Sequence, residues 1–221
     1  MSQQFFEAIR AGDRDKVDAL LNADATLLAA KDEKGLGAYT AAKYAGRNDI
    51  AAMLLEKGVE LDVFGACMAG KKDRALELIA EHPELVNAYS HDGWTSLHLA
   101  CFFGPGVAEA LISKGADVRA RSRNPMQNTP LHAAVAGRNR EAVRVLLEHG
   151  ADVNARQEGG WTALHAASQS GDVEMVRLLI AGGADLQARA ENQQNALDLA
   201  LTKGHQAVVE VLEASAQPSR E

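Results

Sequence analysis

Apolar residues recur along the chain in pairs of helix-length blocks, and a tight turn separates the two blocks of each pair. The clearest pair lies between Trp161 and Arg189. Thr162 is placed to cap a first helix rich in small apolar residues, and Gly171 ends it. Asp172 can cap a second helix, in which apolar residues recur at spacings of three and four. The stretch therefore predicts a helical hairpin whose two helices each bury one face.

The same helical hairpin recurs through the whole sequence. Its inter-helix turn falls at Gly12, Gly46, Gly70, Gly104, Arg138, Gly171 and Gly204. The steps between these turns are 34, 24, 34, 34, 33 and 33 residues. A period near 33 residues predicts a solenoid, in which stacked repeats bury the apolar faces of their neighbours. The expected fold class is therefore all-α.

Seven repeats are expected, and the third differs from the others. The expected boundaries are about 1–33, 34–62, 63–88, 89–120, 121–155, 156–188 and 189–215, with a tail at 216–221. Residues 1–215 are predicted to form a single domain, capped by the first and last repeats. The third repeat lacks about nine residues before its first helix. It resembles the first repeat, since Phe6 and Phe64 each lie six residues before the turn glycine.

Short motifs within the repeats resemble those of ankyrin repeats, of a bacterial type with seven helix pairs including the caps. The motifs are TPLH, DGWT and GADVNA. The resemblance covers nearly the whole chain and implies antiparallel helix pairs with short β-hairpin loops, here called fingers, that border a concave groove. Fingers are expected before every repeat except the first and third. The departures from the motif are the short third repeat, Thr40 and Asp198 in place of His, and Arg138 in place of Gly.

Three histidines, His98, His132 and His165, occupy one column with one member in each of three repeats. Tetrahedral zinc needs ligands about 2 Å from one ion, and residues a repeat apart cannot provide them. The resemblance implies instead that these side chains form hydrogen bonds within and between repeats. The sequence contains no phosphate-binding loop and no elbow around a nucleophilic serine. We therefore predict no catalytic residues, no metal, no cofactor and no enzymatic activity.

Composition narrows the partner classes. The net charge of −7 argues against nucleic-acid binding, because a protein usually binds nucleic acid through a basic face. The N-terminal stretch has no features of a signal peptide, and no apolar run approaches the roughly 18 residues of a membrane span. A cytoplasmic location is therefore expected. Cys67 and Cys101 lie at equivalent positions of consecutive repeats, and we interpret them as small core residues with reduced thiols.

Two columns of residues fall on the expected fingers. One follows the second helix of each repeat and contains Tyr89, Arg121, Arg156 and Arg189. The other precedes the first helix and contains Leu36, Trp94, Asn128, Trp161 and Gln194. The resemblance implies that this second position frequently contacts partners. Tyr44, Phe102 and Phe103 are expected at the end of the first helices that faces the groove.

Aromatic and arginine side chains are the usual anchors of binding hot spots. The predicted partner-binding residues are Tyr44, Tyr89, Trp94, Phe102, Phe103, Arg121, Arg156, Trp161 and Arg189. In the alternative interpretation, the rings pack against neighbouring fingers and the arginines are only solvated. The favoured function is a monomeric scaffold that binds another protein through its concave face without chemistry.

A second function stays open at this point, because the short third repeat leaves a gap between fingers. Leu36, Tyr44, Met68, Trp94 and Phe102 are expected to line this gap as a small apolar notch. Such a notch would have room for a side chain, a short peptide or a small ligand. The alternative function is therefore a small-ligand regulator or an enzyme that uses the notch.

Overall fold

The computed structural model describes residues 1–104 and 106–216. The chain divides into two compact units, Met1–Pro83 and Glu84–Glu221. Within the described residues it contains fourteen α-helices in seven antiparallel pairs, as the periodicity predicts. That the chain forms a single domain stays a prediction.

The first compact unit contains three helix pairs. Their helices are α1 (Ser2–Ala11) with α2 (Arg14–Ala23), α3 (Ala38–Tyr44) with α4 (Asn48–Glu56), and α5 (Val63–Met68) with α6 (Lys72–Glu81). A short 3-10 turn, η1 (Ala25–Ala29), follows α2, and another, η2 (Pro83–Asn87), follows α6. Helix α3 packs between α1 and α5, so the first helices of the three pairs form one layer.

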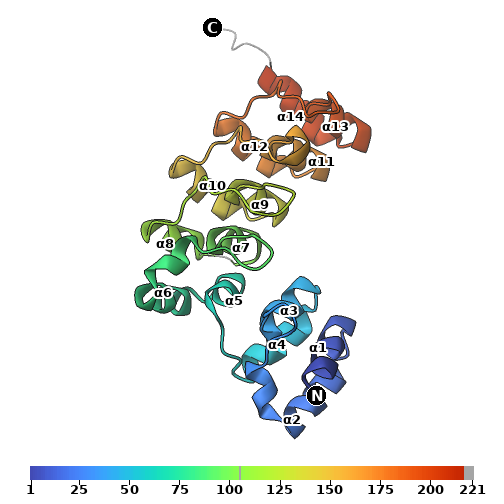
Figure 1. Cartoon of the computed structure of the whole chain (residues 1–221). Helices are drawn as coiled ribbons and strands as arrows, with labels where there is room; N and C mark the ends of the chain where they lie inside the picture. Colours follow the sequence, from blue (N-terminus) through green and yellow to red (C-terminus); the bar gives the residue numbers. More distant parts are fainter. Residues whose placement is uncertain (105, 217–221) are drawn as a thin grey trace. The chain divides into compact units, whose positions relative to one another are not determined.

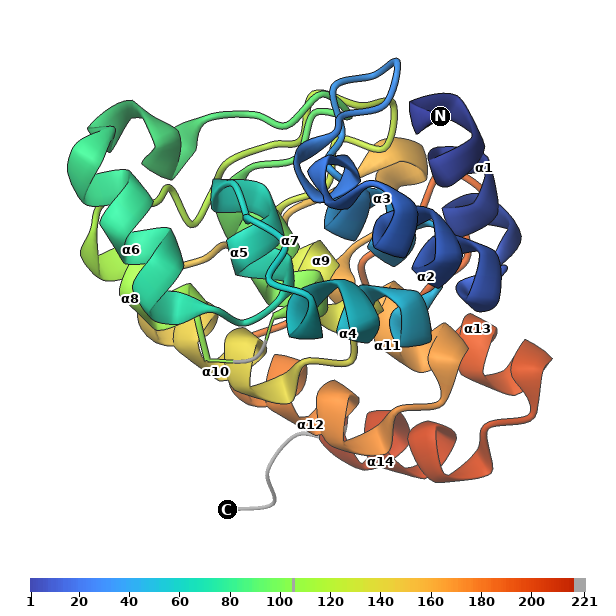
Figure 2. The same ribbon diagram turned by 90° about the horizontal axis from the view of Figure 1, so that it is seen from below.

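The second compact unit contains four helix pairs in two layers. The first helices are α7 (Ser96–Phe103), α9 (Pro130–Ala136), α11 (Ala163–Ser170) and α13 (Ala196–Lys203). The second helices are α8 (Ala108–Ser113), α10 (Arg140–Glu148), α12 (Val173–Ala181) and α14 (Gln206–Ala216). Each helix packs on its counterpart in the next pair, and Figure 1 and Figure 2 show the two stacks from different sides.

Helix starts follow the sequence signals closely in the second compact unit. Thr95, Thr129 and Thr162 cap α7, α9 and α11, and a histidine three residues later bonds back to each cap. Asn195 and Asp198 make the same reciprocal pair at α13, so Asp198 takes the histidine's place without loss of the cap. Such a reciprocal pair satisfies two amide donors that the first helical turn leaves without partners.

The inter-helix turns confirm the predicted positions, and one of them differs in conformation. Residues at the turns adopt left-handed φ angles, including 54° at Arg138 and 72° at Gly171. Gly104, by contrast, is extended with φ of −108°, and the left-handed position is Gly106 with φ of 74°. Gly104 therefore follows α7 and begins the turn, as predicted, while the left-handed residue of this turn lies two positions further on. Pro105 lies outside the described residues.

Short loops lie where fingers were expected, and a backbone hydrogen bond joins the two ends of each loop. These fingers are residues 32–36, 90–94, 122–128, 157–161 and 190–194. In the last, the Ala190 amide donates to the Gln194 carbonyl at 3.0 Å. The described residues form only isolated β-bridges beside two fingers, at Lys31 with Gly37 and Tyr89 with Thr95, because the loops are too short for strands. Before α5 the chain runs directly from Val59 into the Asp62 cap, which confirms that the third repeat begins without a finger.

The core consists mainly of small and aliphatic residues at the helix interfaces. Cys67 and Cys101 are both 0% exposed, which confirms that they are core residues. Met68 is 1% exposed and therefore cannot line an open notch, contrary to the prediction. No described helix is long and apolar enough to cross a membrane.

Candidate protein-binding surface

The fingers of the second compact unit are joined by a ladder of side chains from the predicted column. The Tyr89 hydroxyl donates to the carbonyl of Arg121 at 3.1 Å. Arg121 Nη1 donates to the carbonyl of Arg156 at 2.9 Å, and Arg156 Nη1 donates to the carbonyl of Arg189 at 2.7 Å. Each side chain thus donates a hydrogen bond to the backbone carbonyl of the equivalent residue in the next repeat. The arginines are exposed but hold the fingers together, which neither interpretation of the sequence included.

Hydrogen bonds between backbone groups also connect the same fingers, close to the tips of the loops. The amides of Arg123, Glu158 and Glu191 donate to the carbonyls of Gly93, Met126 and Gly159, at 2.8, 2.9 and 2.9 Å. The approach is so close that a Cβ on Gly93 would lie 2.8 Å from the backbone carbon of Arg123. Gly93 also has φ of +82°, which a residue with a side chain adopts only at a cost. Side-chain and backbone bonds together make these fingers one continuous surface.

Hydrogen bonds of three buried histidines connect fingers to the helix that precedes each of them. His98 Nδ1 lies 2.8 Å from the Thr95 hydroxyl, which donates to it, and His98 Nε2 donates to the Asn128 carbonyl at 2.9 Å. His132 and His165 repeat the arrangement one and two repeats further on, at 3.3 and 3.2 Å from the following finger's carbonyl. This confirms that the histidine column bonds within and between repeats.

Burial sets the charge state of these histidines. It lowers the pKa of His98 to about 4, although the bond to the Asn128 carbonyl acts in the opposite direction. Burial also lowers the pKa of His132 to about 4 and lowers that of His165. The rings are therefore neutral at pH 7 and carry their single proton on Nε2, because that nitrogen faces a carbonyl oxygen.

Three of the predicted aromatic residues gather at the first finger of the second compact unit. The rings of Trp94 and Phe102 lie 6.0 Å apart, and those of Phe102 and Phe103 lie 4.5 Å apart, both edge to face. Trp94 also packs edge to face on His98 at 5.6 Å. All three side chains are half-buried, so part of each ring supports the fold and part remains accessible.

The other predicted residues occupy separate positions. Trp161 is half-buried and packs on His165 with ring centroids 5.7 Å apart, two repeats beyond Trp94. Tyr44 ends α3 in the first compact unit and is 38% exposed. Asn128, which shares the Trp94 column, is only 4% exposed and so contributes little surface.

Sequence reasoning missed two features of the longest finger, residues 122–128. Arg123 lies over the Tyr89 ring, with the guanidinium carbon 3.8 Å from the ring centre. Met126 stands near the tip of this finger and is 50% exposed. The sequence signal was the length of this loop, which exceeds its neighbours by two residues.

In residues 1–104 and 106–216, no group of three or more His, Cys, Asp or Glu side chains could hold a metal ion. His205 is half-buried, and its Nε2 donates to the Gln169 carbonyl at 3.0 Å. It thereby joins the last two repeats, as the other buried histidines join theirs.

The chain matches family models in the region that carries these ladders. A model of three ankyrin repeats matches residues 63–157, and a second model of multiple ankyrin repeats matches residues 139–180. The chain is an ankyrin-repeat protein. Ankyrin repeats generally mediate protein–protein interaction, and the family is generally a non-catalytic module.

Several curated proteins share these ankyrin repeats. The rat ankyrin repeat and SAM domain-containing protein 6 is 34% identical over 103 residues, which is 46% of this chain and 12% of the relative. The human BCL-6 corepressor-like protein 1 is 35% identical over 99 residues, 44% of this chain and 5% of the relative. A putative palmitoyltransferase ZDHHC13 from zebrafish is 32% identical over 158 residues, 71% of this chain and 20% of the relative. The chain thus spans only a small part of these proteins, and the bacterial type stays a prediction.

Proposed function

We propose that this ankyrin-repeat chain is a non-catalytic scaffold that binds another protein through the finger surface of its second compact unit. The finger surface comprises Tyr89, Trp94, Phe102, Phe103, Arg121, Arg156, Trp161 and Arg189, and Tyr44 is a further contact in the first compact unit. The observation that carries the proposal is the ladder of hydrogen bonds that holds the side chains of Tyr89, Arg121 and Arg156 in place across the fingers. A surface that is already ordered loses little conformational entropy when a partner binds.

Charge on the fingers favours an acidic partner segment. Arg121 and Arg156 each place one nitrogen, Nη1, on backbone carbonyls, so other guanidinium donors remain for a ligand. A guanidinium can bind a carboxylate through two parallel bonds, a geometry that lysine cannot provide. Association driven by such pairs should weaken as salt rises, because dissolved ions screen exposed charges.

We place the chain in the cytoplasm, as a monomer that binds neither nucleic acid nor membrane. The net charge of −7 supports the part of this proposal that concerns nucleic acid, because binding to phosphates usually needs a basic face. Size-exclusion chromatography coupled to light scattering measures the molar mass in solution, and the mass of a dimer would contradict the monomeric state.

Replacing Trp94 and Trp161 together with alanine is expected to abolish capture of the native partner. A truncated anchor typically costs about 2 kcal/mol of binding free energy or more. Each replacement should cost less than about 1.5 kcal/mol of folding stability, because both rings are only half-buried. The measurement pairs affinity capture from the native cell with urea unfolding of the same variants.

Arg144→Ala provides a control on the other helix layer, since Arg144 is exposed on α10. It should retain every protein that the wild type captures specifically. Tryptophan variants that are fully folded and still capture the same proteins would refute the finger surface as the binding site. Variants that lose 3–5 kcal/mol of stability, as core truncations do, would show that the rings act in packing.

A further inference from the structure

A cavity of about 210 Å³ lies in the second compact unit, at the loops that follow α8 and α10. These two loops and the cap of α9 form its walls. The lining residues are Val118, Arg119, Arg121, Thr129, Asp152 and Ala155. Two arginines and one aspartate therefore border a space that the side chains of the chain do not fill.

An asparagine joins two such loops at each of the neighbouring positions in this unit. The Asn87 side chain donates from Nδ2 to the Gly115 carbonyl at 3.0 Å, and its Oδ1 accepts a hydrogen bond from the Asp117 amide at 2.9 Å. Asn154 makes the same two bonds to the loop after α12, at 3.2 and 2.8 Å. A carboxamide can make both bonds because it carries a donor and an acceptor.

Arg119 occupies the equivalent position between these two asparagines and makes only one of the two bonds. Its Nε donates to the Gly150 carbonyl at 3.1 Å, as an asparagine Nδ2 would. A guanidinium has no acceptor, so it cannot bond the amide of Asp152. Among residues 1–104 and 106–216, no acceptor bonds this amide. The cavity thus borders a backbone donor that lacks the oxygen atom supplied in the neighbouring repeats.

The charges around this donor favour an anion with a single charge. In the part of the chain that the structure describes, neither Arg119 nor Arg121 forms an ion pair. The Asp152 carboxylate accepts a hydrogen bond from the Asn154 amide of its own loop at 2.9 Å. Two arginines and one aspartate give the lining a net charge of +1. A carboxylate matches this charge, whereas a phosphate group carries about −1.5 to −2.

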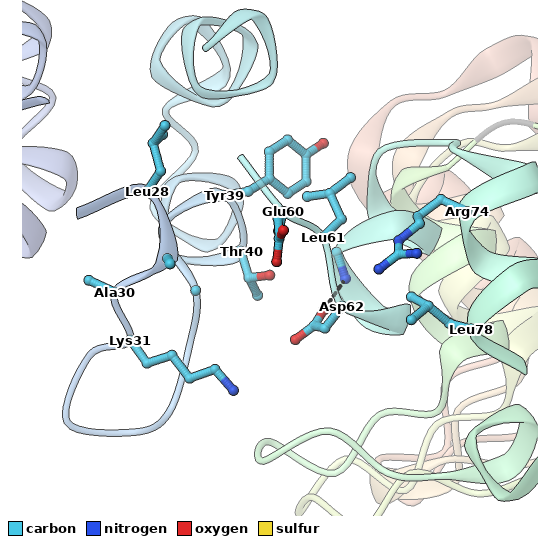
Figure 3. A pocket seen from close by; sticks show the side chains of 13 residues that line it. Leu28, Ala30, Lys31, Tyr39, Thr40, Glu60, Leu61, Asp62, Arg74 and Leu78 are labelled. Carbon is cyan, nitrogen blue, oxygen red and sulfur yellow. Dashed lines mark hydrogen bonds between the residues drawn. The ribbon is translucent and has the colours of Figure 1, made fainter. Parts of the chain in front are cut away.

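The cavity of about 270 Å³ in the first compact unit, shown in Figure 3, has a different character. Its lining contains Glu60 and Asp62 as well as Lys31 and Arg74, so the four charges cancel. The Asp62 carboxylate also accepts a hydrogen bond from the Gly65 amide at 2.7 Å, so the chain itself supplies the acceptor there. In the second compact unit, the amide and the arginines that border the cavity have no such acceptor of their own.

We propose that the cavity at Asp152 binds one side-chain carboxylate of the partner protein. One carboxylate oxygen accepts from the Asp152 amide, and the other accepts from the guanidinium groups of Arg119 and Arg121. Charge-assisted bonds of this kind are stronger than neutral ones. The volume lies below the range of about 300–1,000 Å³ for small-molecule pockets, which suits the end of a single side chain. The inference rests on the proposed scaffold function and gives its acidic partner segment a point of attachment beside Arg121.

The test is an NMR titration of the isotope-labelled intact chain with N-acetylglutamate methylamide. We expect the amide resonance of Asp152 to shift saturably. The Asp185 amide is the internal reference and should not shift, because Asn154 already supplies its acceptor. The uncharged analogue N-acetylglutamine methylamide and inorganic phosphate should each bind at least about tenfold more weakly.

Arg119→Asn introduces the residue that the neighbouring repeats use, so its Oδ1 takes the place of the ligand oxygen. This variant should resist urea as well as the wild type does and should lose binding of the glutamate probe. Arg177→Asn is the matched control, because it removes the same charge from an exposed position on α12. It should bind the probe as the wild type does.

Three results would overturn the proposal. They are an Asp152 resonance that does not respond saturably, a glutamine probe or phosphate that binds as tightly as the glutamate probe, and a folded Arg119→Asn variant that retains binding. The first two need only the wild type, so they decide the matter even if the variant does not fold. The titration needs no partner, so it can fail while the tryptophan replacements still abolish capture, and the scaffold function would then stand without this site.

Discussion

Lowering the pH from 7 to 5 is expected to reduce the free energy of unfolding of the second compact unit by about 3–4 kcal/mol. The cause is burial of His98 and His132, which lowers the pKa of each to about 4 in the folded chain. The unfolded value is near 6.5. Between these values the unfolded chain takes up protons and the folded chain does not. The stabilisation is therefore complete above pH 6.5 and is lost as the pH falls toward 4.

His132→Ala should remove about half of this pH dependence. At pH 7 the same replacement should cost about 1–3 kcal/mol, because it leaves the Trp161 carbonyl and the Thr129 cap without their partner. Urea unfolding, monitored by tryptophan fluorescence, reports on the second compact unit, because both tryptophans lie in it. His149→Ala, at an exposed position on α10, is the control for the loss of an imidazole outside the buried column. Equal stability of the wild type at pH 7 and pH 5 would contradict the neutral, buried state of the column.

Gly137→Ala is expected to destabilise the second compact unit by about 3 kcal/mol. Gly137 ends α9 with φ of −77°, so its backbone conformation suits any residue. The obstacle is space, because an added Cβ would collide with the Phe102 carbonyl and lie 2.8 Å from the Phe102 Cα. Backbone atoms of a packed helix cannot move aside without disturbing the interface between α7 and α9. Urea unfolding measures the loss.

Gly182→Ala is the matched control, because Gly182 ends α12 with nearly the same angles, φ −78° and ψ 1°. Its added Cβ would meet the Leu147 side chain at 2.8 Å, and the end of a side chain can rotate away. This change should therefore cost less than about 1 kcal/mol. Similar losses in the two variants would mean that the approach of α9 to Phe102 is looser than described.

The sequence was sufficient to predict most of the fold, because each repeat carries its own helix and turn signals. The caps at Thr162 and Asp172 and the direct entry into α5 all follow from local rules. The left-handed residue of the fourth turn could not be predicted, because Gly104 and Gly106 both suit that conformation and the repeat spacing alone favoured the first. The structure shows that Gly106 takes the left-handed conformation.

The candidate surface was less predictable, because its bonds join positions about thirty residues apart. The column of Tyr89 and three arginines was visible in the sequence, but the carbonyls that these side chains reach were not. A column of arginines is compatible with side chains that are only solvated and with side chains that form hydrogen bonds to the next finger. Only the distance between the fingers distinguishes these two alternatives. The notch expected from the short repeat was not confirmed, because the spacing of turns could not show that Met68, one of its expected lining residues, is buried in the helix interface.

The most direct test of the proposed scaffold function is hydrogen–deuterium exchange of the chain with and without its captured partner. Binding at the finger surface should slow exchange at the fingers 90–94, 122–128, 157–161 and 190–194, where opening of the loops exposes their amides. The second helices α8, α10 and α12 should exchange at the same rate in both samples. Slower exchange confined to those helices, with unchanged fingers, would contradict the finger surface as the binding site.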